Sequence, residues 1–279
     1  MTDPRTTPSN GRVAHISLEG QVAAERFVNG RWMMIQQPMV NITDAPRGNR
    51  VSQLLFGERF LSLETADGFA FGMAERDNYV GYILSGALTG AEDATHWVTN
   101  PATHLYPKPD FKSPPDVALF FGSQVKVAGE RDGFLRIQTG HHIPAQHLTP
   151  IRARFSDPVG IADLFLGTPY LWGGTSRWGI DCSGLVQAAL LACGIPCPRD
   201  SDQQEAALGT ALPEGAALQR GDLVFWRGHV GIMANDHMLL HANAHHMAVA
   251  YEPLAEAVER IEAREFGAVT SFRRLSLAA

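Results

Sequence analysis

The first half of the chain consists of short apolar runs separated by turn-forming residues. Gly, Asn, Asp and Pro lie between the runs, as at Asn29-Gly30 and Asp67-Gly68. Short strands joined by such turns are typical of small barrels and sandwiches. We therefore predict all-β structure here, with strand candidates at Trp32–Ile35, Arg59–Leu63, Tyr79–Leu84, Gln124–Val127 and Phe134–Ile137.

One order of motifs occurs twice in this region. The aromatic-Gly pair Phe56-Gly57 precedes a strand candidate and the turn Asp67-Gly68-Phe69, and Phe121-Gly122 likewise precedes Asp132-Gly133-Phe134. The repeat predicts two consecutive modules, residues 31–90 and 91–150. Pro, Thr, Ser and Asn dominate the first ten residues and predict a mobile tail, which begins an N-terminal tail and lead-in over residues 1–30.

Residues 151–279 show a mixed pattern that predicts an α+β fold. Val159–Leu166 is a short helix candidate, and apolar positions along Cys182–Ala192 form one stripe of an amphipathic helix. Gly194 and Pro196 follow that helix in the order expected of a helix end. The strand candidates are Leu223–Trp226, His229–Ala234, His237–Ala242, Met247–Tyr251 and Ser271–Leu275.

Composition and charge exclude several classes of protein. Lys and Arg number 23 against 29 Asp and Glu, a net charge of −6, which argues against a nucleic-acid-binding protein. No apolar run approaches the ~18 residues of a membrane span. The N-terminus lacks the apolar core of a secretion signal, so we expect a cytoplasmic protein. Three cysteines are too few, and odd in number, for a disulfide framework.

Cys182 has the sequence context of a nucleophile. A Gly-rich stretch from Trp172 to Gly179 leads into the predicted helix, with Cys182 in its first turn. The free N–H groups and partial positive charge of a helix N-terminus favour a thiolate, so we expect a lowered pKa. The same amides could bind an oxyanion, and the glycines would let a substrate backbone approach. A packed structural thiol is the alternative.

A cysteine nucleophile needs a base, and a predicted hairpin supplies His229 and His241. A two-residue turn at Asn235-Asp236 would place the two imidazoles on opposite faces of the sheet. A three-residue loop that includes His237 would place them on one face as diagonal neighbours. We predict the three-residue loop, because a base and its orienting partner must touch.

The other cysteines and histidines predict no metal or cofactor. Cys193 and Cys197 are spaced as a C-x3-C pair, but no second ligand pair follows at the spacing of a zinc finger. His245 and His246 are adjacent, so on a strand they would face apart.

These motifs together resemble the NlpC-type family of papain-like bacterial cell-wall cysteine peptidases. The resemblance covers about 120 C-terminal residues, through Pro169–Gly174, Asp181–Leu185, Gly221–Leu223, His229–Ile232 and Leu240–Ala242. It implies a papain-like core in which the helix bearing the cysteine packs on an antiparallel sheet. It also implies that Cys182 is the nucleophile, His229 its base and His241 the orienting partner. Tyr170 would help the Cys182 amide to bind the oxyanion.

The preceding modules make the chain similar to the γ-D-glutamyl-L-diamino-acid endopeptidases, which carry SH3-like barrels before this domain. That resemblance implies a murein peptide substrate with a free N-terminal L-Ala. Asp200 and Ser201 would bind its ammonium group, Glu58 would assist and Tyr79 would close the pocket; Ser183 and Trp172 would also contact substrate. As alternatives, Asp200 could cap a helix and Tyr79 could belong to a barrel core.

The predicted function is hydrolysis of the γ-D-glutamyl bond of free wall peptides during peptidoglycan recycling. The enzyme alternative is a secreted murein hydrolase that acts on intact wall. A further alternative on the same core is an acyltransferase or transglutaminase. The non-enzyme alternative is a protein that binds wall peptides without cleaving them.

Overall fold

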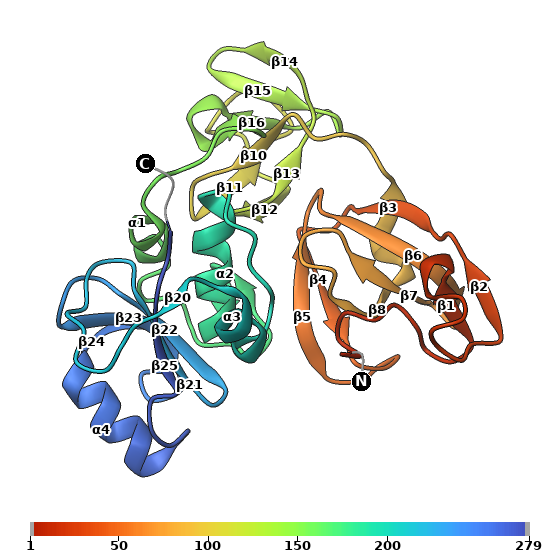
Figure 1. Ribbon diagram of the computed structural model, residues 1–279. Helices are drawn as coiled ribbons and strands as arrows, with labels where there is room; N and C mark the ends of the chain where they lie inside the picture. Colours follow the sequence, from red (N-terminus) through yellow and green to blue (C-terminus); the bar gives the residue numbers. More distant parts are fainter. Residues whose placement is uncertain (1–2, 277–279) are drawn as a thin grey trace. The chain divides into compact units, whose positions relative to one another are not determined.

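The computed structural model describes residues 3–276. The chain divides into two compact units, an N-terminal unit that ends at Ala153 and a C-terminal unit that begins at Arg154 (Figure 1). Within the described residues, no helix is long and apolar enough to cross a membrane.

The first β module of the N-terminal unit is a seven-stranded sheet of order β5-β4-β8-β7-β6-β3-β9. A cluster of buried side chains that includes Ile35, Leu54 and Phe60 forms its core. The short helix η2 (Ser85–Ala87) precedes its last strand. The strands are β3 (Arg31–Ile35), β4 (Met39–Thr43), β5 (Arg50–Leu55), β6 (Arg59–Ala66), β7 (Phe69–Ala74), β8 (Val80–Leu84) and β9 (Leu88–Gly90).

The second β module is also all-β and has three small sheets, of order β13-β10-β17, β11-β12 and β14-β15-β16. Its core contains Leu119, Val125 and Ile143, and Phe56 of the preceding module packs into it. The elements are β10 (His96–Val98), β11 (Ala102–Leu105), β12 (Val117–Phe120), β13 (Gln124–Val125), β14 (Val127–Arg131), β15 (Phe134–Ile137), β16 (His142–Pro144), η3 (Ala145–His147) and β17 (Leu148–Pro150).

The repeated Asp-Gly-Phe motif makes the same turn in both modules. Asp67 and Gly68 have φ of 50° and 82°, and Asp132 and Gly133 have φ of 51° and 77°. Two successive positive φ values are those of a type I′ turn, which matches the twist of the strands that it joins. The turns connect β6 to β7 and β14 to β15, so the repeated motif forms the same turn twice, and a repeat of the whole module stays a prediction.

The N-terminal segment, described from Asp3, is not a mobile tail. Among its first ten residues, the Arg5 carbonyl oxygen accepts from the Val80 N–H at 2.8 Å, and that of Pro8 accepts from the His15 N–H at 3.0 Å. It contains β1 (Val13–His15), η1 (Ile16–Leu18) and β2 (Arg26–Val28), and Val13 packs in a cluster with Leu61 and Phe71 of the first β module. Arg12 and Arg26 both pair with Glu64, at 2.7 and 2.6 Å. The segment is ordered by one buried apolar side chain, by backbone pairing and by ion pairs. These contacts leave no periodic pattern of hydrophobic residues in the sequence, so the sequence did not predict the order.

The C-terminal unit contains a six-stranded antiparallel sheet of order β20-β25-β21-β22-β23-β24. Helix α2 lies against β22 and β23. Helix α4 covers a cluster that includes Val224, Met233 and Leu239 of the sheet. The helices are α1 (Pro158–Asp163), α2 (Cys182–Ala192), α3 (Ser201–Ala207) and α4 (Leu254–Arg264). The strands are β18 (Thr175–Ser176), β19 (Gly179–Ile180), β20 (Thr210–Ala211), β21 (Leu223–Trp226), β22 (His229–Met233), β23 (Met238–Asn243), β24 (Ala248–Pro253) and β25 (Ser271–Arg274).

Candidate active site

Cys182 is the first residue of α2, and Asp181 caps this helix. The Asp181 carboxylate accepts hydrogen bonds from the backbone N–H of Gly184 at 2.7 Å and from that of Gly173 at 2.8 Å. One side chain therefore satisfies a free amide of the helix N-terminus and fixes the loop that precedes it. The Cys182 side chain is buried.

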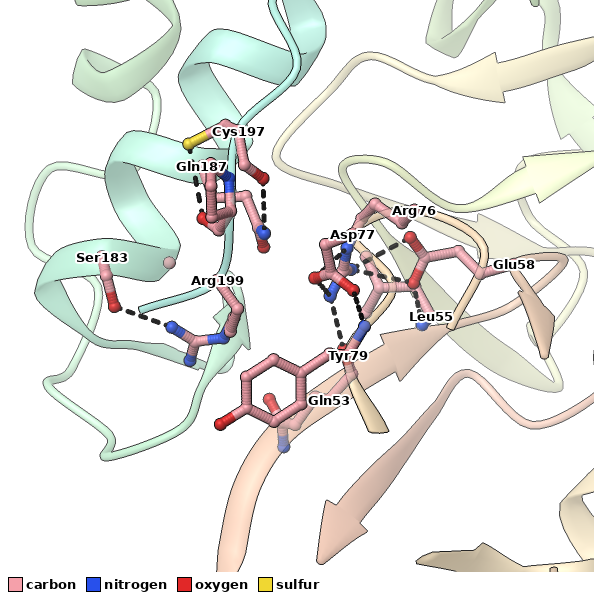
Figure 2. Close-up of polar contacts among 12 residues, drawn as sticks. Gln53, Leu55, Glu58, Arg76, Asp77, Tyr79, Ser183, Gln187, Cys197 and Arg199 are labelled. Atoms are coloured by element: carbon pink, nitrogen blue, oxygen red, sulfur yellow. Dashed lines mark hydrogen bonds and ion pairs between the residues drawn. The ribbon is translucent and has the colours of Figure 1, made fainter. Parts of the chain in front are cut away.

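The Arg199 guanidinium also binds the Asp181 carboxylate. It donates to both Asp181 oxygens, at 3.0 and 2.7 Å, and to the Ser183 hydroxyl at 2.8 Å; Figure 2 shows the contact with Ser183. Arg199 is 1% exposed. Charged residues are almost never buried so completely without a partner. The sequence interpretation did not assign Arg199 a role; Asp181 and Arg199 together fix where α2 begins.

The glycines of the loop serve its own packing. A Cβ at Gly174 would meet the Gly179 carbonyl oxygen at 2.4 Å, and one at Gly184 would meet the Gly174 oxygen at 2.5 Å. Backbone segments approach so closely here that only glycine fits. These glycines thus meet an internal steric requirement, and the predicted approach of a substrate backbone to the Gly-rich lead-in stays a prediction.

His229 and His241 share one face of the sheet, as predicted. The pairs Ile232–Leu240 and Met233–Leu239 show that the hairpin loop has three residues. Nε2 of His229 lies 2.9 Å from Nδ1 of His241, and both side chains are buried. The predicted register is confirmed, and the two imidazoles are in hydrogen-bond contact.

Cys182 begins α2, which packs against β22, the strand that starts at His229. The backbone N–H groups of Val230 and Ser183 lower the pKa of Cys182, but burial and the Asp181 charge outweigh them. Burial thereby raises the pKa of Cys182 to about 12. The predicted fall in pKa is wrong for the resting protein, because desolvation of a fully buried thiol exceeds the effect of the helix N-terminus.

His229 is also neutral at rest. Burial, assisted by the nearby His241 and Arg260, lowers the pKa of His229 well below its ordinary value. The imidazole stacks on the Phe266 ring, with centroids 5.5 Å apart and planes at 7°, and lies 5.5 Å from the Trp226 ring. These aromatic neighbours keep water from the ring, so the resting pair is a thiol beside a neutral imidazole.

Tyr170 is half-buried, and its predicted part in binding the oxyanion stays a prediction. Its backbone N–H is bonded to the Met247 carbonyl oxygen at 2.8 Å. Burial, together with the charges of Cys182 and Asp181, raises the pKa of Tyr170 above its ordinary value. The hydroxyl therefore remains protonated over the range in which proteins function.

Two further residues extend the histidine pair. Oε2 of Glu252 lies 2.9 Å from Nε2 of His241, and Arg260 donates to both oxygens of Glu252 at 2.8 Å. The sequence interpretation ended the last hairpin strand at Tyr251 and predicted no helix over α4, so it missed both residues. A buried acidic position at the end of β24, followed by an apolar period through Leu254, Ala257 and Ile261, is the signal that could have identified them.

The predicted substrate residues of the C-terminal unit lie in three settings. Asp200 is the N-cap of α3 in a capping box with Gln203, the structural alternative weighed for it, and Ser201 is buried at the first helical position. The Ser183 hydroxyl donates to Asp181 at 3.3 Å and accepts from Arg199. Trp172 is 65% exposed. A substrate contact by any of them stays a prediction.

Glu58 and Tyr79 belong to the N-terminal unit. Glu58 is buried and accepts hydrogen bonds from the Arg76 guanidinium at 3.0 Å and from the Leu55 N–H at 2.7 Å (Figure 2). Burial raises the pKa of Glu58, and Arg76 opposes that effect. Glu58 is thus paired within its own unit, and its predicted contact with the substrate ammonium group stays a prediction. Tyr79 packs in the core cluster of the first β module, and its predicted role at a substrate pocket stays a prediction.

Two family models match parts of the chain. The model of the NlpC/P60 family matches residues 167–262. The model described as the bacterial dipeptidyl-peptidase Sh3 domain matches residues 42–88. The first match contains the whole constellation from Tyr170 to Arg260, and the second lies within the first β module.

Several curated proteins and solved structures are similar to the chain. It is 30% identical over 160 residues to "Gamma-D-glutamyl-L-lysine dipeptidyl-peptidase" of Bacillus subtilis (strain 168), covering 52% of each chain. It is 36% identical over 121 residues to "Dipeptidyl-peptidase 6" of Lysinibacillus sphaericus, covering 43% of this chain and 44% of that protein. The chain thus spans about half the length of these two relatives.

Two further similarities cover more of the compared protein. The structure of an NlpC/P60 family protein from Bacillus cereus ATCC 10987 aligns with a TM-score of 0.75 at 20% identity, over 89% of this chain and all of that one, and so shares the fold. "Probable endopeptidase NlpC" of Escherichia coli (strain K12) is 36% identical over 109 residues, which cover 34% of this chain and 70% of that protein. This chain, with its buried Cys182, His229 and His241, belongs to the NlpC/P60 family.

Proposed function

We propose that this protein is a cysteine endopeptidase that hydrolyses an amide bond through an acyl-enzyme. The observation that carries the proposal is that Cys182 begins α2, which packs against β22, while His229, the first residue of β22, is hydrogen-bonded to His241. A nucleophile, a base and an orienting partner are the parts that such a reaction needs.

In the first step, the Cys182 sulfur attacks the substrate carbonyl carbon as the thiol proton passes to His229. The pair is neutral at rest, so proton transfer accompanies attack. The carbonyl oxygen acquires negative charge, which the Cys182 N–H and the Tyr170 hydroxyl would stabilise. Collapse of the tetrahedral intermediate breaks the C–N bond, and the His229 imidazolium gives its proton to the departing amine.

In the second step, His229 takes a proton from water, whose oxygen attacks the thioester carbon. The carboxylic acid product leaves, and His229 returns the proton to the Cys182 sulfur. The histidine thus ends each cycle neutral, in the state that its buried surroundings favour.

We propose that the bond cleaved is the γ-D-glutamyl-L-diamino acid bond of murein peptides with a free N-terminal L-Ala. The names of the B. subtilis and B. cereus relatives, "Gamma-D-glutamyl-L-lysine dipeptidyl-peptidase", support this substrate class. The bacterial dipeptidyl-peptidase Sh3 match in the first β module supports it too. Asp200 and Ser201 remain the candidates for binding the substrate ammonium group.

The reaction is tested by mass spectrometry of the products formed from a free tripeptide L-Ala-γ-D-Glu-diamino acid. We expect wild-type protein to release L-Ala-γ-D-Glu, Cys182→Ala protein to release none, and chelators to leave the rate unchanged. Full activity of the Cys182→Ala protein or chelator-sensitive turnover would reject the mechanism. Transfer of the dipeptide to added amines in preference to water would show an acyltransferase.

The proposed role in recycling is tested by the N-terminus of the substrate. We expect cleavage of free tripeptide and tetrapeptide but not of the same peptides capped by muramic acid, and a cytoplasmic location in cell fractions. Activity on polymeric sacculi would indicate a hydrolase of intact wall instead. Tight binding of all these peptides without any cleavage would indicate a wall-peptide-binding protein.

A further inference from the structure

Four buried or partly buried side chains form one hydrogen-bonded row: His229, His241, Glu252 and Arg260. His229 contacts His241 at 2.9 Å, His241 contacts Glu252 at 2.9 Å, and Glu252 accepts two bonds of 2.8 Å from Arg260. His241 is fully buried, and the side chains of Glu252 and Arg260 are 7% and 11% exposed. The row runs from β22 through β23 and β24 to helix α4.

The chemistry of the row fixes where each proton lies. An ionised carboxylate only accepts hydrogen bonds, so Nε2 of His241 must carry the proton that points to Glu252. A neutral imidazole has one N–H, so Nδ1 of His241 is the acceptor. Nε2 of His229 must then donate to it. Nδ1 of His229 is left without a proton, which makes it the nitrogen free to receive the thiol proton of Cys182.

We propose that Glu252, held in place by Arg260, is a positioning residue that sets the tautomer of His229 through His241. This inference rests on the proposed peptidase function and extends it by two residues. Neither Glu252 nor Arg260 touches the substrate; each acts through the histidine pair. In a Cys–His pair a single group orients the histidine. Here three residues do so, and every hydrogen bond between the two histidines and Glu252 is donated toward Glu252.

The charges in the row agree with this assignment. Although burial raises it, hydrogen bonds from Arg260 and His241 hold the pKa of Glu252 well below its ordinary value, so the carboxylate is ionised. Burial lowers the pKa of His241, and Glu252 opposes that effect. Further charged or titratable groups near the row are Cys182 from α2, His246 before β24 and Glu265, which follows α4 and pairs with Arg260.

The first test reads the tautomers directly and needs no turnover. In Cys182→Ala protein, ¹⁵N NMR of the imidazole nitrogens should show His229 and His241 both as neutral Nε2–H tautomers. In the Glu252→Gln variant, position 252 has a donating nitrogen as well as an accepting oxygen, so we expect a mixture of tautomers at His241 and His229. An Nδ1–H tautomer of His241 in the presence of Glu252, or unchanged tautomers in Glu252→Gln protein, would overturn the proposal.

The second test compares the pH dependence of kcat/KM in variants of the two members of the ion pair, Glu252 and Arg260. Glu252→Gln removes a negative charge and should move the acid limb of kcat/KM to lower pH, whereas Arg260→Met removes a positive charge and should move it to higher pH. We expect kcat of Glu252→Gln to fall on the order of 10- to 100-fold with KM little changed. Arg260→Lys, which keeps a donor and the charge, should restore most of the rate.

Matched controls separate this role from simple stability. Glu256 and Arg264 are exposed residues of the same helix, and Glu256→Gln and Arg264→Met should leave the pH profile and the tautomers unchanged. Shifts of the acid limb in the same direction for Glu252→Gln and Arg260→Met would contradict the proposal. If wild-type protein cleaves no peptide, the NMR result still decides the role of Glu252, so failure of the proposed function is recognised separately.

Discussion

At the scale of single residues, the site shows how burial changes the chemistry expected of a cysteine. The position of Cys182 at a helix start could be predicted from the Gly-rich approach and the apolar stripe that follows. Its raised pKa could not, because desolvation depends on which segments cover the sulfur. Burial acts on His229 in the complementary direction and keeps the base neutral.

The neutral resting pair can be measured in the ultraviolet. The difference spectrum between wild-type and Cys182→Ala protein should show no thiolate absorbance near neutral pH, because burial raises the pKa of Cys182 to about 12. Thiolate should form only as the pH rises toward that value. A thiolate band that persists from neutral pH down to pH 5 would contradict a neutral pair and indicate a resting ion pair.

Tyr170 is expected to act in the transition state rather than in binding. Tyr170→Phe removes one donor from the proposed oxyanion site, so kcat should fall on the order of 100- to 1000-fold, with KM little changed. Tyr251→Phe is the matched control, since the Tyr251 hydroxyl bonds Asp163 on an exposed surface. A Tyr170→Phe loss that appears only in KM would assign Tyr170 to ground-state binding.

At the scale of elements, the local pattern predicted most strands and helices of the site. It did not predict the contacts between elements, which depend on packing. The hairpin register followed from one chemical requirement, contact between His229 and His241, and the structure confirms it. Helix α4 and the ends of β24 were missed because their importance comes from the partners they meet across the sheet. The Asp181–Arg199 contact was missed for the same reason, since the two residues are distant in sequence.

The Asp181–Arg199 pair makes a prediction about the stability of the elements that it joins. Arg199→Met leaves the Asp181 charge buried without its guanidinium, which should cost about 3–5 kcal/mol in the free energy of unfolding. Urea unfolding followed by tryptophan fluorescence measures this cost. Arg220→Met is the control, because the exposed Arg220–Asp157 pair should contribute less than about 1 kcal/mol. Equal losses for both variants would show that burial of the Arg199 pair has no special effect.

At the scale of the whole chain, repeated turn motifs and the cysteine motif predicted the order of its parts. The division after Ala153 separates a unit built of β-sheets from one with a sheet and helices, whereas the expected mobile tail is contradicted. The bounds of the two β modules stay a prediction. The tail was mispredicted because polar composition was read as disorder. Arg12, Arg26 and Glu64 make ion pairs that depend on a partner strand, so the local sequence does not reveal them.

The contribution of Val13 to anchoring the N-terminal segment can be measured as a change in the free energy of unfolding. Val13 is fully buried against the first β module, so Val13→Ala should lower the free energy of unfolding by about 1.5 kcal/mol for the two carbons removed. Val117→Ala is the same substitution at a side chain that is 38% exposed and should cost less. Hydrogen exchange of residues 3–28 gives a second measurement, and unprotected amides throughout this segment would contradict the anchored structure.

The proposed reaction requires Cys182 to form a covalent acyl intermediate with a wall peptide. Intact-protein mass spectrometry after rapid acid quench, with free L-Ala-γ-D-Glu-diamino acid tripeptide as substrate, tests it most directly. We expect wild-type protein to gain the mass of an L-Ala-γ-D-Glu acyl group, located on Cys182 by fragmentation, and Cys182→Ala protein to gain none. Release of L-Ala-γ-D-Glu by the Cys182→Ala protein, or an adduct on any residue other than Cys182, would contradict it.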